Sequence, residues 1–220
     1  MDLVIPVNAE EVIKANYSPA IISRMVFLVE QGYILAREAT KHISFLDWEI
    51  GQYHEGYLRP IAINYLFKKD VEEGLLPFTM KTEYNRNKSH KFLLFEQGST
   101  KMTISQVNSS QAVARPAYFR TKLQEANQIS FNWFEDEPQV SDDQEQYLLL
   151  TFNSGGEEPR FVNLGVPGEK YWQYKLNLMK EPREIIMPNR DLEKEEIITA
   201  PDTFFGLQKF IKEVEGSGNG

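Results

Sequence analysis

Residues 56–84 read GYLRPIAINYLFKKDVEEGLLPFTMKTEY, and the hydrophobic period changes within this stretch. In its first half, apolar residues recur three and four positions apart, as on one face of a helix, and Pro60 lies in the first turn, where proline is tolerated. Beyond Gly74, Phe78 and Met80 alternate with polar neighbours, which is the two-residue repeat of a half-buried strand. The stretch therefore predicts a helix followed by a strand.

A second helix is predicted on the N-terminal side. Ser18 suits the N-cap and Pro19 the first helical position. Residues 21–36 are the most apolar part of the chain, but charged residues interrupt them, so they indicate a buried helix and no membrane span. We expect Gly32 to break this helix and residues 33–45 to resume as a separate segment.

Strand patterns dominate the C-terminal side. Residues 90–96 form an apolar run, and alternation resumes after the turn at 97–99, which predicts a three-stranded antiparallel meander. Residues 146–152 and 160–166 predict a second hairpin. Its inward-facing residues are expected to be Val162, Leu164 and Val166. Because helices come first and hairpins follow, we predict an α+β fold with a C-terminal helix and disfavour parallel βαβ units.

Shorter elements complete this prediction. They are a helix at 115–124, a strand at 129–134, an acidic loop at 135–145 and an amphipathic helix at 201–214. The 220 residues and 41% hydrophobic content suit one globular α+β domain over residues 1–215, followed by a flexible Gly/Ser tail at 216–220.

The composition narrows the chemistry. The chain has no cysteine, which excludes disulfides, thiolate zinc sites, iron–sulfur clusters and a cysteine nucleophile. Residues 1–6 do not resemble a signal peptide, so we expect a cytoplasmic protein that does not insert into a membrane.

Charge is distributed unevenly along the chain. Residues 81–122 carry a net charge of +6, whereas the rest carries −14. The candidate nucleic-acid-binding residues are Lys81, Arg86, Lys88, Lys91, Lys101, Arg115, Arg120 and Lys122. Tyr84, Tyr118 and Phe119 would offer stacking surfaces beside these cations, a combination that suits phosphates and bases. Two other interpretations stay open: a solvated strand surface, or contact with the acidic 135–145 loop of the same chain.

Catalytic motifs are not recognisable. His42, His54 and His90 lack metal-ligand spacing, and the carboxylates near His54 read as a solvated loop more readily than as an acid–base cluster. We therefore assign no catalytic residue, no metal ligand and no cofactor. Residues 37–42, from Arg37 to His42, resemble the R-x4-H motif of HEPN ribonucleases, but HEPN domains are all-helical and this chain turns to strands after Leu76.

Aromatic residues indicate where a protein partner would bind. Tyr171, Trp172 and Tyr174 form a dense patch, and Phe204 and Phe205 are adjacent on the predicted C-terminal helix. Aromatic side chains anchor interfaces because they bury a large area at a small entropy cost, although the patch at 171–174 would equally suit the core. These five residues are the interface candidates.

Residues 84–88 (YNRNK), 147–151 (YLLLT) and 161–167 (FVNLGVP) resemble uncharacterised small proteins of Gram-positive bacteria and their prophages. The resemblance implies an accessory role in a mobile element and no particular activity. We expect a non-catalytic protein-interaction or regulatory module with a protein partner. The first alternative is nucleic-acid binding by residues 81–122, and the second is a metal-dependent nuclease whose carboxylates meet only in the fold.

Overall fold

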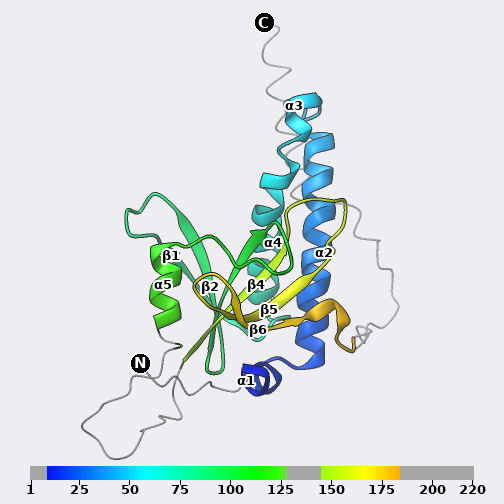
Figure 1. The fold of residues 1–220 in the computed structure, drawn as a ribbon. Coiled ribbons are helices and arrows are strands. Elements are labelled where there is room, and N and C mark those ends of the chain that lie inside the picture. The colour runs from blue at the N-terminus through cyan, green and yellow to red at the C-terminus, as the bar shows by residue number, and fades with distance from the viewer. Residues whose placement is uncertain (1–8, 126, 128–144, 184–220) are drawn as a thin grey trace, which may run out of the picture.

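The computed structural model describes residues 9–125, 127 and 145–183, in which helices cover one face of a six-stranded sheet (Figure 1). The helices are α1 (Ala9–Asn16), α2 (Pro19–His42), α3 (Glu49–Gln52), α4 (Glu55–Glu72) and α5 (Tyr118–Glu125), with a 3-10 turn at Leu178–Lys180. The strands are β1 (Thr79–Tyr84), β2 (Lys91–Gln97), β3 (Thr100–Val107), β4 (Gln146–Asn153), β5 (Val162–Pro167) and β6 (Trp172–Asn177). The predicted α+β class is confirmed.

Helix α2 begins as predicted but does not break at Gly32. The Ser18 hydroxyl accepts a hydrogen bond from the Ile21 backbone N–H at 3.3 Å, which caps the helix. Gly32 is buried against α4, where a Cβ atom would lie 2.2 Å from Cγ1 of Ile63. The predicted break is therefore wrong, because this glycine allows two helices to approach closely and does not end one.

Helix α2 is, within the described part of the chain, the one helix long and apolar enough to cross a membrane by length and composition. Nine of its residues are buried, among them Met25, Val26 and Val29. Six of the nine, including these three, belong to the hydrophobic core that α2 shares with α4 and the sheet. The cytoplasmic location stays a prediction.

The sheet has strand order β1-β2-β3-β4-β5-β6. The predicted meander and second hairpin are confirmed as antiparallel neighbours, whereas β3 and β4 pair in parallel. The long connection at 108–145, which contains α5, returns the chain to the same end of the sheet. The order of elements disfavours parallel βαβ units, and among the described strands the β3–β4 pair departs from that expectation.

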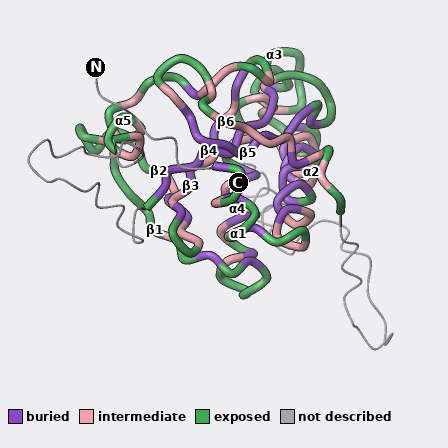
Figure 2. The backbone as a smooth tube through the Cα atoms, turned by 60° about the horizontal axis from the view of Figure 1, so that its bottom comes forward, coloured by how far each residue is buried: buried purple, intermediate pink, exposed green. Residues whose placement is uncertain are grey.

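The core lies between α1, α2, α4 and one sheet face. In Figure 2 buried stretches run along α2 and the central strands. The sheet contributes Phe95, Met102, Leu148, Leu150 and Phe152, together with the three predicted residues Val162, Leu164 and Val166. Each such side chain contributes about 1.5–3 kcal/mol by leaving water, so this layer fixes the positions of β3 and β4.

Four sequence predictions lie wholly or largely outside the described residues. They are the strand at 129–134, the acidic loop at 135–145 except Glu145, the helix at 201–214 and the tail at 216–220.

Candidate functional site

Strands β2 and β3 diverge soon after the turn that joins them. They form three residue pairs next to that turn and none beyond it. Residues 91–94 then pair only with β1, and residues 103–107 pair only with β4. We call this opening the fork, and its two inner edges have no strand partner within the described residues.

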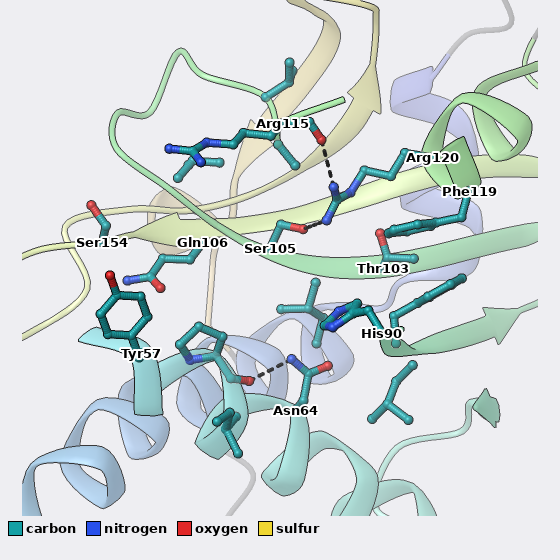
Figure 3. A pocket seen from close by; sticks show the side chains of 18 of the residues that line it. Tyr57, Asn64, His90, Thr103, Ser105, Gln106, Arg115, Phe119, Arg120 and Ser154 are labelled. Carbon is teal, nitrogen blue, oxygen red and sulfur yellow. Dashed lines mark hydrogen bonds between the residues drawn. The ribbon is translucent and has the colours of Figure 1, made fainter. Parts of the chain in front are cut away.

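A cavity of about 1130 Å³ occupies the fork (Figure 3). Helix α4 forms one wall with Pro60, Ile61 and Asn64. The connection after β3 forms another wall, which includes Arg115 and Arg120. The described lining holds apolar, neutral polar and cationic side chains but no aspartate or glutamate, although the chain has 32 acidic residues.

Arg120 reaches from α5 to β3 and has no carboxylate partner among the described residues. Its Nη1 donates to the Arg115 carbonyl at 2.8 Å, and its Nη2 donates to the Ser105 hydroxyl at 2.9 Å. Its Nε is buried without a hydrogen-bond partner. Burial lowers the pKa of this guanidinium because desolvation disfavours its charge. An anion here would offset that cost.

Tyr118 lies beside two cations at the mouth of the fork. The Arg86 guanidinium is 5.3 Å and the Lys122 ammonium 5.1 Å from the centroid of the Tyr118 ring, which is half-exposed. A second cavity of about 610 Å³ lies beside them, and its described lining also has no carboxylate. Nearby, Lys91 lies 5.2 Å from the ring centroid of Tyr84. We call these five residues the cationic–aromatic surface.

The eight candidate cations separate into two groups. Arg86, Lys91, Arg115, Arg120 and Lys122 border the two cavities or the cationic–aromatic surface. The others are Lys81, which pairs with Glu96 at 2.9 Å, Lys101, which pairs with Glu145, and Lys88, which lies in the β1–β2 turn with a φ of 54°. Of the eight cations, Lys101 fits the interpretation that they contact the acidic 135–145 loop, because Glu145 belongs to that loop.

The predicted aromatic patch on β6 is mostly built into the fold. Trp172 donates its indole N–H to the Ala112 carbonyl at 3.1 Å, and Tyr174 packs against the core. Tyr171 is exposed. Phe204 and Phe205 lie outside the described residues.

A group of exposed large apolar residues lies where α2, α3 and α4 meet, at the end of the helical layer farthest from α1 (Figure 1). We call it the apolar tip; it comprises Phe45, Trp48, Ile50, Tyr53, Tyr57 and Ile61. Sequence reasoning missed it because the residues around His54 read as a solvated loop. The available signal was the density of aromatic residues in so short a connection.

The residues of the R-x4-H motif do not form a site. Five helical positions separate Arg37 and His42, which places them about 140° apart around α2. Arg37 donates to the Glu157 carbonyl, and His42 contacts the Glu38 carboxylate at 3.1 Å. The HEPN resemblance therefore does not extend to a converging pair.

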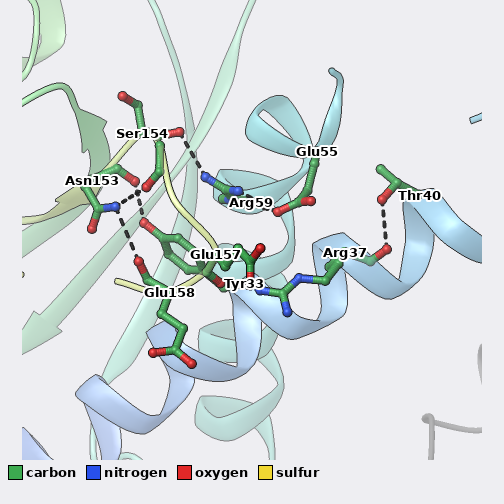
Figure 4. Close-up of polar contacts among 10 residues, drawn as sticks. Tyr33, Arg37, Thr40, Glu55, Arg59, Asn153, Ser154, Glu157 and Glu158 are labelled. Carbon is green, nitrogen blue, oxygen red and sulfur yellow. Dashed lines mark hydrogen bonds and ion pairs between the residues drawn. The ribbon is translucent and has the colours of Figure 1, made fainter. Parts of the chain in front are cut away.

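Arg37 belongs to a polar network that anchors the β4–β5 turn (Figure 4). Arg59 pairs with Glu55 at 2.5 Å and donates to the Ser154 carbonyl at 2.9 Å. Tyr33 donates to the Asn153 carbonyl. These contacts hold Ser154, at the rim of the fork cavity, in place.

No group of three or more His, Asp or Glu side chains in the described ranges is arranged to hold a metal ion. No structural observation on these residues therefore favours the metal-dependent nuclease. Comparisons of the chain with protein-family models, curated proteins and solved structures give no match. The proposals below consequently rest on the site alone.

Proposed function

We propose that the chain is a non-catalytic nucleic-acid-binding protein that holds a single strand on the cationic–aromatic surface. The observation that carries this proposal is the pair of cavities whose described lining residues include cations and no carboxylate, in a chain of net charge −8. Such a lining attracts a polyanion, because cations release counterions when they bind phosphates.

The aromatic side chains favour nucleic acid over a small anion. Tyr84 and Tyr118 are each half-exposed and each lies beside a cation. Base stacking on aromatic rings, with phosphates on neighbouring Lys and Arg, is how proteins bind single strands without reading sequence. A free phosphate would use the cations and leave the rings without a role.

The test is fluorescence anisotropy with a labelled single-stranded oligonucleotide at low salt. Arg86→Glu/Lys122→Glu reverses both cations beside Tyr118, and affinity should fall at least about tenfold. Lys68→Glu/Lys69→Glu on α4 gives the same change in net charge and should shift affinity by less than about twofold. Equal losses in both variants would contradict a localised site.

A protein-interaction module remains the second candidate, and the apolar tip is the observation that favours it. Tyr53 is 83% and Phe45 72% exposed, and aromatic side chains are enriched where proteins bind one another. A Phe45→Ser/Tyr53→Ser variant that folds normally should lose a partner captured by the wild type. If the variant captures the same proteins as the wild type, the apolar tip is not the partner-binding surface. The accessory role in a mobile element stays a prediction.

A further inference from the structure

We infer that the fork is a pocket for one unstacked base of the bound single strand, with its phosphate near Arg120. This inference rests on the proposed function and names the part of the ligand that enters the protein. It is carried by three features of the described residues: the diverging strand edges, the mixed lining and the Arg120 Nε atom without a partner.

The unpaired strand edges suit the polar edge of a base. Along residues 103–107, β3 pairs only with β4, so its peptide groups on the fork side have no ladder partner. Peptide N–H and C=O groups are obligatory hydrogen-bonding groups. A base inserted edge-on would supply hydrogen-bond donors and acceptors to these peptide groups, as a neighbouring strand does elsewhere in the sheet.

The walls of the fork suit the faces of a base. Ile61, Leu93 and Ile104 contribute apolar surface, while Asn64 and Gln106 contribute amide groups that donate and accept. Figure 3 shows Asn64 and His90 on one side of β3 and Arg120 with Ser105 on the other. A flat, partly polar ring fits this lining better than a compact ion does.

Arg120 lies where the fork cavity meets the second cavity, beside the cationic–aromatic surface. Arg120 and His90 line both cavities, so one strand can pass from the Tyr118 side into the fork. A phosphate beside the half-buried side chain of Arg120 would supply the anion that the described surroundings lack. The fork is open to a single strand, whereas a base in a duplex is paired and stacked and must first be extruded.

The experiment compares three labelled oligonucleotides of equal length at one salt concentration: a single strand, the same strand with abasic sites throughout, and the duplex. The single strand should bind about tenfold or more tightly than the abasic strand, because base contacts are lost while phosphates remain. The duplex should also bind more weakly than the single strand.

Asn64→Trp and Ile61→Trp each place an indole into the fork from α4. Ile61 is 65% exposed, so this second variant tests the inference if Asn64→Trp fails to fold. Both should reduce the preference for the single strand over the abasic strand to about twofold or less. Ile34→Trp, at a half-exposed site on α2 outside the cavity, is the matched control and should keep that preference.

Equal binding of abasic and normal strands, or an unchanged preference in both fork variants, would overturn this inference and leave the proposed function standing. Absence of binding to every oligonucleotide would overturn both. Displacement of the single strand by an acidic peptide at comparable concentration would show that the fork selects an extended polypeptide instead.

Discussion

The rings of Phe92, on β2, and Phe119, on α5, stack with their centroids 3.9 Å apart and their planes 18° from parallel. Helix α5 contains no buried residue, so its position depends on half-buried contacts of this kind. Other contacts of α5 include the Arg120–Ser105 hydrogen bond, the Gln124–Gly168 hydrogen bond at 3.1 Å and the Arg86–Tyr118 cation–π contact. This stack therefore holds α5, with Tyr118 and Lys122, at the mouth of the fork.

Phe119→Ala should release α5 from the sheet. We expect a loss of about 1–2 kcal/mol in the free energy of unfolding, since a half-buried aromatic pair is removed. Amide hydrogen exchange in α5 should accelerate while exchange in β4 stays slow. Phe119→Tyr, which keeps the ring, is the control. Unchanged exchange in α5 of the alanine variant would show that the stack does not position this helix.

Asp70→Ala should destabilise the protein by about 2–4 kcal/mol. The Asp70 side chain is nearly buried and accepts two hydrogen bonds from Arg24, one of them at 3.0 Å, so its removal leaves a half-buried cation unpaired. Glu72→Ala, which breaks an exposed pair with Lys68, should cost less than about 1 kcal/mol. Urea unfolding measures both, and equal losses would contradict a structural role for the Arg24–Asp70 pair.

Gly32→Ala should destabilise the protein by about 1–3 kcal/mol, although alanine is the better helix former. The added methyl group would overlap Ile63 and force α2 and α4 apart. Gly155→Ala is the control, because nothing lies within 4 Å of its added Cβ. Thermal unfolding compares the two, and a more stable Gly32→Ala would show that the helices separate easily.

Tyr33 should make stability fall at alkaline pH. Burial raises its pKa from 10.0 to about 12, so the folded state keeps a proton that the unfolded state loses above about pH 10. The neutral Tyr33 side chain makes its whole contribution to the free energy of unfolding below pH 10. Between about pH 10 and 12 this contribution declines by up to about 1.4 kcal/mol per pH unit. Burial also raises the pKa of Tyr17 and Tyr147, which adds to the decline.

Tyr33→Phe should make this decline shallower while costing about 1 kcal/mol at neutral pH, because the hydrogen bond to Asn153 is lost. Tyr53→Phe, at an exposed position, should leave the pH profile unchanged. Urea unfolding at several pH values gives both profiles. If the free energy of unfolding falls equally steeply with pH in the wild type and in Tyr33→Phe, Tyr33 does not cause the decline.

The strands and helices near residues 56–107 follow from local patterns, because Phe78, Met80 and Met102 recur at strand spacing on a face that the core buries. The parallel β3–β4 pair was not predictable in this way. Its partners are separated by the connection at 108–145, and no local pattern specifies which distant edge a strand joins.

The charge pattern of the sequence identified the candidate cations. It did not predict which of them border the cavities and which pair with carboxylates. Lys81 and Lys101 have the same sequence signal as Arg86, and their carboxylate partners become neighbours only through strand register. The fork was not predictable from the sequence either. Its lining comes from β2, β3, α4 and the connection after β3, and it opens because the β2–β3 pairing ends after three residue pairs, which no sequence pattern signals.

The most direct measurement is the affinity of the wild-type protein for a labelled single-stranded oligonucleotide over a range of salt concentrations. If phosphates contact about four of Arg86, Lys91, Arg115, Arg120 and Lys122, the logarithm of the affinity should fall against the logarithm of salt concentration with a slope of about −3. A slope near zero, or no binding even at the lowest salt, would contradict the proposed function.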